Sequence, residues 1–219
     1  MRQSAHWILP VLWVTTVLAG CSGSHHSAVQ TAPEPATSGM ARARADSLRH
    51  PYVQADVDFM SHMIGHHAQA LVMAGWAPSH GASTQVQTLA GRIINGQQDE
   101  IATMQRWLRD RGKPVPEATP GAMKMKMGGA EHEMLMPGML TPEQMKDLDQ
   151  ARGPEFDRKF LTYMIQHHKG AVAMVNDLFA TTGAAQDETV FKFANDVSVD
   201  QTTEINRMQR MLDGLPATP

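Results

Sequence analysis

Hydrophobic positions along most of this 219-residue chain recur at the spacing of one helix face, and this pattern predicts four long helices. The first two are expected at 52–77 and 83–111, where glycine and proline follow and end them. The third and fourth are expected at 154–182 and 187–213, and a shorter helix is expected at 141–152. We find no run of strand-forming residues that alternates with period two, so no sheet is expected.

The first and third predicted helices carry the same residue types at eight positions that lie 101 residues apart. These pairs are Asp56 and Asp157, Phe59 and Phe160, Met63 and Met164, Ile64 and Ile165, His66 and His167, His67 and His168, Ala70 and Ala171, and Met73 and Met174. The second and fourth helices repeat at a spacing of 104, which pairs Gln97 with Gln201, Glu100 with Glu204, and Met104 with Met208. One such hairpin cannot bury its apolar stripe alone, so we predict an all-α fold in which two repeated helical hairpins form a four-helix bundle.

The segments outside the helices complete the predicted organisation of the chain. They comprise a signal peptide at 1–20, a flexible tether at 21–50 and a helical domain at 51–214, the last divided into hairpin 1 (52–112), a Met-rich crossover (113–153) and hairpin 2 (154–214). The tether is expected because residues 22–49 are rich in Ser, Ala, Thr, Pro and Gly and show no apolar periodicity.

The N-terminus resembles a bacterial lipoprotein signal. Arg2 precedes an apolar run at 7–18, and Leu18-Ala19-Gly20 then lead to Cys21. Such a signal implies cleavage before Cys21 and attachment of lipid to its thiol. We therefore expect a lipid-anchored protein on the periplasmic side of the bacterial envelope, in the outer membrane where the cell has one. A short membrane anchor or an ordinary secretory signal is the alternative.

Composition narrows the chemistry to histidine, carboxylate and thioether groups. The chain has 17 methionines and one cysteine, so it can form neither an internal disulfide nor a multi-thiolate zinc site. A net charge of -3 gives no basic footprint for nucleic acid, and nucleic-acid binding is not expected.

Helical spacing places one histidine of each adjacent pair, His66 and His167, on the inward face of its helix, with methionines one and two turns away. A single inward histidine is more often a core imidazole bonded to a carboxylate, and a methionine stripe is usually core packing. The repetition of the set favours a metal site instead. Its candidate ligands are Met63, His66, His67, Met73, Glu100, Met104, Met164, His167, His168, Met174, Glu204 and Met208.

Seven methionines lie between Met123 and Met145, in a crossover longer than most helix connections. Exposed thioethers oxidise easily and contribute little to packing, so neither a linker without function nor a partner-binding patch explains them well. Thioether sulfur needs no deprotonation and suits Cu(I). The candidates for metal capture here are Met123, Met125, Met127, His132, Met134, Met136 and Met139.

Four stretches of the chain have the motifs of a known family. They are DVDFMSHMIGHHAQALVMA from Asp56, FLTYMIQHHKGAVAMV from Phe160, the spacing Q..EI..MQ.WL that ends at Leu108, and Met136-Pro137-Gly138-Met139. They resemble the bacterial domain of unknown function numbered 305 (DUF305), over nearly all of the chain from Asp56 to Leu212.

The resemblance implies a ferritin-like four-helix bundle, and some members of the family are associated with copper binding and copper tolerance in the envelope. Only the His, Met and Glu positions that match are carried over to this chain. Met211 stands where the first copy has Trp107, and Tyr163 stands where it has His62, so any site that uses His62 is asymmetric.

The sequence therefore predicts an envelope protein that binds copper, as Cu(I), and either sequesters it or hands it to a copper-handling envelope partner. We expect a binder rather than a catalyst, with no organic cofactor. A ferritin-like di-iron oxidase is the first alternative, although no Glu is followed three residues later by His, as that class requires. A metal-free interaction module is the second. One shared metal site and two separate sites remain equally open.

Overall fold

The computed structural model describes residues 36–49, 51–121, 123–127 and 130–216. Within these residues there are six helices and two short strands: α1 (Ala36–Arg49), α2 (Gln54–Gly75), α3 (Thr84–Asp110), β1 (Met123–Met127), β2 (Ala130–Met134), α4 (Pro142–Gln150), α5 (Pro154–Ala180) and α6 (Glu188–Asp213). The helical class predicted from the sequence is confirmed, and the ends of the four long helices lie within two residues of the predicted ones.

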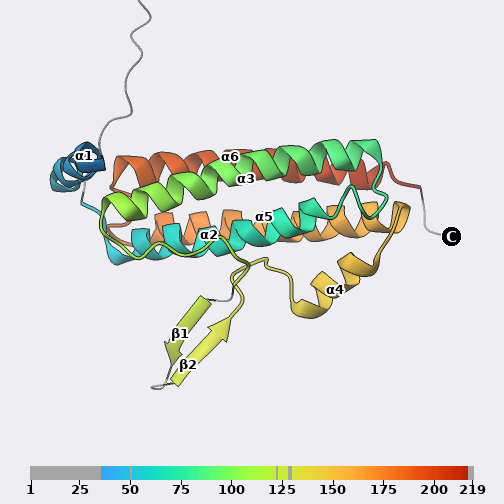
Figure 1. Ribbon diagram of the computed structural model, residues 1–219, viewed down its shortest axis with the longest axis horizontal. Helices are drawn as coiled ribbons and strands as arrows, with labels where there is room; N and C mark the ends of the chain where they lie inside the picture. Colours follow the sequence, from blue (N-terminus) through green and yellow to red (C-terminus); the bar gives the residue numbers. More distant parts are fainter. Residues whose placement is uncertain (1–35, 50, 122, 128–129, 217–219) are drawn as a thin grey trace, which may run out of the picture. The chain divides into compact units, whose positions relative to one another are not determined.

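The four long helices lie side by side (Figure 1). Helix α2 packs along α3, α5 packs along α6, and the two pairs meet where α2 contacts α5. This arrangement brings the two histidine pairs, one on α2 and one on α5, into the same region of the interior.

Short polar side chains near the starts of the long helices cap them or bind the interhelical turn of the other helix pair. Ser83 caps α3 by accepting a hydrogen bond from the Val86 N–H. Asp56, in the first turn of α2, accepts from the Ala185 N–H in the α5–α6 turn, at 2.7 Å. Its repeat partner Asp157 accepts in the same way from the Ser83 N–H in the α2–α3 turn, at 3.0 Å. Both carboxylates are buried, so they connect the two pairs in matching places.

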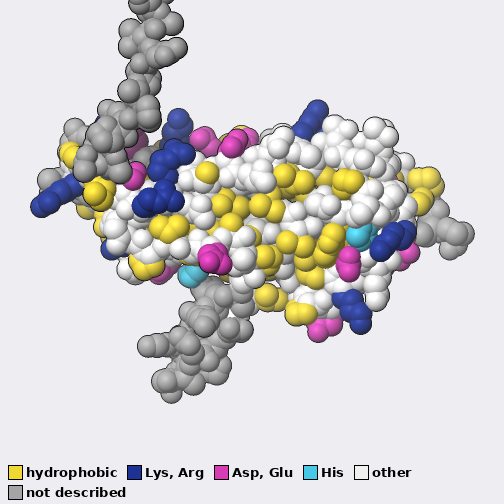
Figure 2. Space-filling view, viewed as in Figure 1, with side chains coloured by type: hydrophobic (Ala, Val, Ile, Leu, Met, Phe, Trp, Pro, Cys, Tyr) yellow, Lys and Arg dark blue, Asp and Glu magenta, His cyan; other side chains and the backbone are white. Residues whose placement is uncertain are grey.

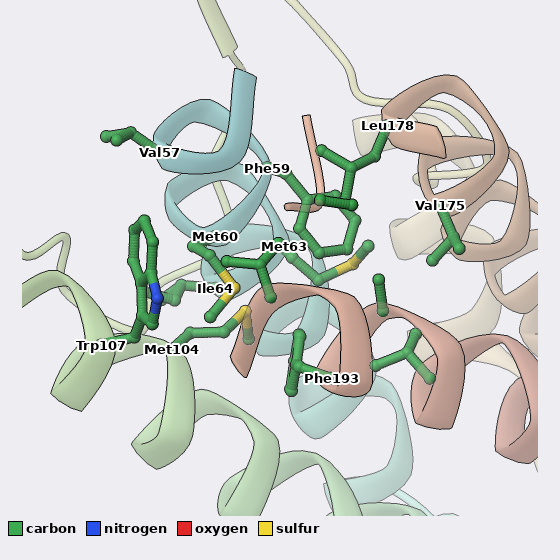
Figure 3. Close-up of a cluster of buried hydrophobic side chains, with 14 of the residues drawn as sticks. Val57, Phe59, Met60, Met63, Ile64, Met104, Trp107, Val175, Leu178 and Phe193 are labelled. Atoms are coloured by element: carbon green, nitrogen blue, oxygen red, sulfur yellow. The ribbon is translucent and has the colours of Figure 1, made fainter. Parts of the chain in front are cut away.

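Two buried hydrophobic clusters fill the interior, one toward each end of the helices. The first contains Met60, Met63 and Met104 together with aromatic side chains such as Phe59, and Figure 3 shows these methionine side chains among their aliphatic and aromatic neighbours. The second contains Met73, Met164 and Met208 together with Phe156 and Phe160. Methionine therefore contributes to the packing at both ends.

The prediction that the chain has no sheet is wrong for the crossover. Strand β1 pairs antiparallel with β2, from Met123 opposite Met134 to Met127 opposite Ala130. The Met-Lys-Met-Lys-Met stretch does alternate with period two, but Met and Lys are weak strand formers, and the apolar β-branched residues that normally mark a strand are missing. Gly128 and Gly129 stand between the two strands in the sequence, as in many hairpins.

The tether expected at 21–50 also differs, because helix α1 occupies Ala36–Arg49. This stretch holds Met, Ala, Arg and Leu, which favour helix and offset the Ser and Gly beside them. The predicted signal peptide and Cys21 lie outside the described residues. None of the helices described has both the length and the apolar character that crossing a membrane requires.

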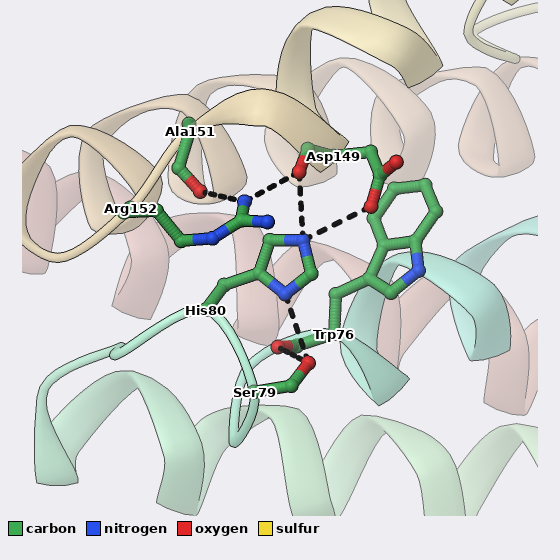
Figure 4. Close-up of polar contacts among 6 residues, drawn as sticks. All are labelled: Trp76, Ser79, His80, Asp149, Ala151 and Arg152. Carbon is green, nitrogen blue, oxygen red and sulfur yellow. Dashed lines mark hydrogen bonds and ion pairs between the residues drawn. The ribbon is translucent and has the colours of Figure 1, made fainter.

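A buried histidine joins the α2–α3 turn to the end of α4 (Figure 4). The His80 Nε2 lies 2.8 Å from the Asp149 carbonyl oxygen and 3.0 Å from Asp149 Oδ1, while Nδ1 lies 2.9 Å from Ser79 Oγ. The His80 carbonyl accepts from the Gly153 N–H at 2.8 Å. Both ring nitrogens are thus occupied, and this histidine has a structural role.

Replacing Asp187 by alanine is expected to lower the free energy of unfolding by about 3–5 kcal/mol, the usual cost of removing one partner of a buried ion pair. Asp187 is fully buried at the start of α6, where it accepts hydrogen bonds from Arg111, Trp107 Nε1 and the N–H groups of Thr189 and Val190. Urea denaturation measures the change.

The matched control is Asp213→Ala at the exposed end of the same helix, where, among the described residues, the carboxylate accepts a hydrogen bond from Gln209 alone. This change should stay within about 0.5 kcal/mol of the parent protein. Equal losses in the two variants would contradict the role given to Asp187.

Candidate metal centre

The two inward histidines meet at the contact between α2 and α5. The ring centroids of His66 and His167 lie 3.9 Å apart with the ring planes 38° apart, and both side chains are fully buried. The distances from His66 to His67 and from His167 to His168 are both 6.2 Å between centroids, with the same interplanar angle of 57°. The four imidazoles therefore form one layer, the histidine layer, with matched geometry on the two helices.

Each imidazole of the histidine layer donates a hydrogen bond through Nε2 to an oxygen that can only accept. His66 donates to the Pro137 carbonyl at 3.0 Å, and His167 donates to the His66 carbonyl at 3.0 Å. His67 donates to Glu100 Oε2 and His168 to Glu204 Oε2, both at 2.6 Å. In a neutral ring the proton is therefore on Nε2, and Nδ1 carries a free lone pair.

The Nδ1 atoms of the histidine layer are buried and have no hydrogen-bond partner among the described residues. Four unsatisfied ring nitrogens in one layer are unusual, since most buried polar atoms are paired. A ring whose Nε2–H is held by a carboxylate or a carbonyl, with Nδ1 free, has the form that metal-binding histidines adopt. The layer thus offers nitrogen lone pairs that the fold itself does not use.

Burial keeps the two central rings uncharged. Desolvation lowers the pKa of His66 from 6.5 to about 3, and the neighbouring histidines add to this effect more strongly than the Pro137 carbonyl offsets it. Desolvation also lowers the pKa of His167 well below its ordinary value, with the other three histidines adding to the shift. Both rings are therefore neutral near pH 7, as coordination through nitrogen requires.

Acidification from about pH 7 to about pH 5 is expected to destabilise the fold through these two rings. In the unfolded chain a histidine of pKa 6.5 takes up a proton over this range, whereas His66 in the fold does not. Because the folded pKa is the lower one, the stability is present above pH 6.5 and is lost as the pH falls toward about 3. At about pH 5 the loss from His66 alone is about 2 kcal/mol, and His167 acts in the same direction.

Urea denaturation at the two pH values measures this loss. The variant His66→Gln, which cannot titrate at this position, should lose less stability on acidification than the parent protein. An identical pH dependence in both proteins would contradict a buried neutral His66.

Buried methionines flank the histidine layer on both sides. Met63 and Met104 lie in the first hydrophobic cluster, and Met174 packs against it half-buried. Met73, Met164 and Met208 lie in the second cluster and are fully buried. Among the described residues no three side chains of His, Cys, Asp or Glu come together as metal ligands. A metal site with three or more side-chain ligands in this layer would therefore need a donor besides these residue types, and the flanking methionines offer thioether sulfur.

The crossover is fixed to the histidine layer at the turn Met136–Met139. Gln69 on α2 forms two hydrogen bonds with Leu140, one to its N–H at 2.7 Å and one to its carbonyl at 3.0 Å. Gln166 on α5 donates to the Gly138 carbonyl at 3.3 Å. The prediction that Met136 and Met139 are exposed is wrong, since they are 3% and 5% exposed. Long-range bonds to α2 and α5 bury this part of the crossover.

The hairpin β1–β2 holds the other candidates of the crossover. Its register places Met123 opposite Met134 and Met125 opposite His132, and Met127 lies two positions beyond Met125 on the same strand. The positions between them pair Lys124 with Glu133 and Lys126 with Glu131. Alternate positions of a strand share a face, so the Met and His positions fall on one face of the hairpin and the charged positions on the other. Met134 is 45% exposed.

A crevice between α3 and α6 contains the two carboxylates that accept hydrogen bonds from the histidine layer. Its volume is about 170 Å³, and Glu100, Asp200 and Glu204 line it together with Gln97 and Gln201. Asp200 is exposed, but partial desolvation at the crevice wall raises its pKa, and the nearby carboxylates of Glu100, Asp196 and Glu204 add to the shift. Negative charge is therefore concentrated here. On the face seen in Figure 2, by contrast, Lys and Arg occur in small separate groups rather than in one basic patch.

These features define a helical protein with a buried histidine layer between two clusters that contain methionine. The family described as "Domain of unknown function (DUF305)" matches residues 56–212, and the chain belongs to this family. No curated protein sequence matches the chain.

Solved structures of the same family are similar to this chain. The DUF305 fragment from Deinococcus radiodurans is 29% identical, with a TM-score of 0.61 and coverage of 74% of this chain and 98% of that one. The putative secreted DUF305 protein from Streptomyces coelicolor is 26% identical, with a TM-score of 0.61 and coverage of 73% and 92%. The Cu(I)-bound form of CopM is 26% identical, with a TM-score of 0.56 and coverage of 74% and 98%. CopM has also been solved with Cu(II) and with Ag bound.

Sequence reasoning missed several residues that shape the site. Met60 is fully buried in the first cluster beside Met63, but it has no methionine counterpart in the second copy. Gln69 and Gln166, which hold the crossover, and Gly170, whose missing Cβ makes room for the Pro137 and Gly138 backbone, were hidden for a related reason. They stand at positions where the two copies differ, so the departures from the repeat were the available signal.

Proposed function

We propose that this protein binds copper, as Cu(I), through imidazole nitrogen and thioether sulfur, and that it sequesters the ion or hands it to an envelope partner. The nitrogen ligands come from the histidine layer (His66, His67, His167 and His168) and the sulfur ligands from the flanking methionines, because no three described His, Cys, Asp or Glu side chains come together around one ion. The frame is a ferritin-like four-helix bundle built from two repeated hairpins. The protein acts as a binder rather than as an enzyme.

The observation that carries this proposal is the set of four buried Nδ1 atoms without hydrogen-bond partners among the described residues. Their rings are oriented by Nε2–H bonds, as metal-binding histidines are. Thioethers lie in the clusters on both sides, and soft sulfur favours Cu(I) over harder ions. The Cu- and Ag-bound forms of CopM, at 26–28% identity, support the same chemistry.

The hairpin β1–β2 captures the ion before it reaches the histidine layer in this proposal. One face of the hairpin carries the positions of Met123, Met125, Met127, His132 and Met134. The turn that follows contacts the layer directly, because the Pro137 carbonyl accepts the His66 Nε2–H. The hairpin and the turn that contacts His66 are thus consecutive in the chain, and in this proposal the ion passes from one to the other.

We place the protein in the bacterial envelope, anchored through lipid on Cys21. This part of the proposal rests on the sequence of residues 1–21. Thioether and imidazole ligands fit such a compartment, because they continue to bind where free thiols are oxidised.

An anaerobic competition titration tests the proposal. Cu(I) is added to the copper-free protein in the presence of a chromogenic Cu(I) chelator, and Zn(II) and Fe(II) are titrated in parallel. We expect Cu(I) to bind with a dissociation constant below about 1 μM, which corresponds to about 8 kcal/mol, and Zn(II) and Fe(II) to bind more weakly. Failure to bind any of the three metals would favour a metal-free interaction module. Oxidation of Fe(II) with consumption of oxygen would favour a ferritin-like oxidase.

A further inference from the structure

The crevice between α3 and α6 is chemically different from the histidine layer. Oxygen-bearing side chains line most of it, namely Gln97 and Glu100 from α3 and Asp200, Gln201, Thr203 and Glu204 from α6. No imidazole or thioether lines it. With a volume of about 170 Å³, it has room for about six water molecules at their liquid volume.

Two glutamines in the crevice are buried without partners. Gln97 is 3% exposed, and neither Oε1 nor Nε2 has a hydrogen-bond partner among the described residues. Gln201, its counterpart in the repeat, is 2% exposed, and its Oε1 is equally unpaired. A buried amide without a partner destabilises the fold unless water or a ligand satisfies it. Two unpaired amide oxygens on facing helices therefore point to a ligand that binds to oxygen lone pairs.

The charge around these amides favours a cation. Glu100, Asp200 and Glu204 line the crevice, and Arg92 is the single basic residue among those that line it. The neighbouring groove shares Glu100 and Asp200 and adds three carboxylates and one lysine. The lining of this groove consists of Gly96, Asp99, Glu100, Thr103, Glu188, Thr189, Lys192, Phe193, Asp196 and Asp200.

We propose that this crevice binds one hydrated divalent cation that prefers oxygen ligands, of the magnesium class. Amide and carboxylate oxygens are the protein ligands of such ions, which keep several of their waters and use only one or two carboxylates. This agrees with the absence, among the described residues, of three His, Cys, Asp or Glu side chains close enough to bind a bare ion. The amide oxygens of Gln97 and Gln201 contact the ion or its waters.

This cation site is separate from the proposed copper site but adjoins it. The Oε2 atoms of Glu100 and Glu204 accept from His67 and His168, so the same carboxylates face both sites. The inference stands whether or not copper binds, since it rests on the amides and carboxylates of the crevice alone.

Titration of copper-free protein with MnCl₂ tests the proposal. The electron paramagnetic resonance signal of free Mn²⁺ reports binding, and Mn²⁺ broadening of side-chain amide resonances reports its location. We expect one saturable equivalent that Mg²⁺ displaces, with selective broadening of the Gln97 and Gln201 amides. The double variant His66→Ala and His167→Ala should bind Mn²⁺ as the parent does. Mn²⁺ binding can therefore be tested independently of the copper proposal.

Asp200→Asn supplies the decisive variant, because Asp200 is exposed enough to be replaced without loss of packing. Removing its charge should weaken Mn²⁺ binding about tenfold or more, because affinity at such sites follows the number of charged ligands. The matched control Asp177→Asn removes an exposed carboxylate from α5, away from the crevice, and should leave binding unchanged. Absence of saturable binding, equal weakening in both variants, or broadening confined to other residues would overturn the proposal.

Discussion

Replacing His66 and His167 together by alanine is expected to weaken Cu(I) binding by at least about 100-fold, because mutating groups that merely orient metal ligands already costs about 10- to 100-fold. The two rings lie in contact at the centre of the histidine layer, with centroids 3.9 Å apart. Their Nδ1 lone pairs are buried and unused by the fold. Removing both takes away the two neutral rings that meet where α2 contacts α5.

The matched control is His62→Ala. His62 lies one turn before His66 on the same helix, is partly exposed, and has Tyr163 as its counterpart in the second copy. We expect this variant to bind Cu(I) nearly as the parent does. A second pair of changes, His66→Phe and His167→Phe, fills the space that alanine leaves. Loss of binding in a folded phenylalanine variant then reports on the nitrogens rather than on a collapsed interior. Unchanged affinity in both double variants would remove the histidine layer from the copper site.

Replacing Gly170 by alanine is expected to cost about 3 kcal/mol of unfolding free energy or more, at the upper end of overpacking effects. A Cβ at this position would lie 1.9 Å from the Pro137 carbonyl oxygen and 2.6 Å from the Gly138 Cα. Both neighbours are backbone atoms, so no side-chain rotation can relieve the contact. Gly138, with φ of +76°, faces the same helix and would bring its own Cβ within 2.6 Å of the Gln166 carbonyl oxygen. The turn therefore has to move away from α5.

Thermal or urea denaturation measures the cost, and hydrogen exchange at the Leu140 amide, which donates to Gln69, reports release of the turn. Gly91→Ala in α3 is the matched control, because a Cβ there meets nothing within 4 Å. In an exposed helix this change should raise stability by about 0.5–1 kcal/mol. Similar effects of the two substitutions would contradict the close docking of the crossover on α5.

Release of the turn also bears on copper, because the Pro137 carbonyl holds the Nε2–H of His66. A Gly170→Ala protein that remains folded should bind Cu(I) more weakly although no proposed ligand has changed. Weaker binding would show that Cu(I) affinity depends on the orientation of the His66 ring and not only on the presence of the residue.

The long helices were predictable from the sequence because each buries a continuous apolar stripe with a helical period. The inward placement of His66 and His167 followed from the same spacing, and the structure buries both fully. The carboxylates that bind His67 and His168 were also among the predicted residues, since the repeat marked Glu100 and Glu204. Which of these residues coordinate metal stays a prediction.

The docking of the crossover was not predictable from local pattern, because it depends on contacts between residues distant in the chain. Two positions nevertheless carried a signal. Gly65 corresponds to Gln166 in the repeat, and Gln69 corresponds to Gly170. One crossover cannot contact two symmetric helices in the same way. On α2 the glycine precedes the glutamine by four residues, and on α5 the glutamine precedes the glycine by four residues. Departures from a repeat thus mark where the symmetry of the fold is broken.

The hairpin β1–β2 was missed for a different reason. Its strands contain Met, Lys, Glu, Ala and His, which have weak strand preferences, and the pairing register rather than propensity defines the element. The register refines the original hypothesis for the crossover. Five of its seven candidate positions fall on one face of the hairpin, whereas Met136 and Met139 are buried in the turn that follows.

X-ray absorption at the copper edge, on protein loaded anaerobically with one equivalent of Cu(I), tests the central claim most directly. The proposal predicts both imidazole nitrogen and thioether sulfur in the first coordination shell. It also predicts that the imidazole contribution falls in the double variant His66→Ala and His167→Ala, which keeps only His67 and His168 of the layer, while the His62→Ala protein gives the parent spectrum. A shell of oxygen ligands alone, or a spectrum that the double variant leaves unchanged, would contradict a copper site in the histidine layer.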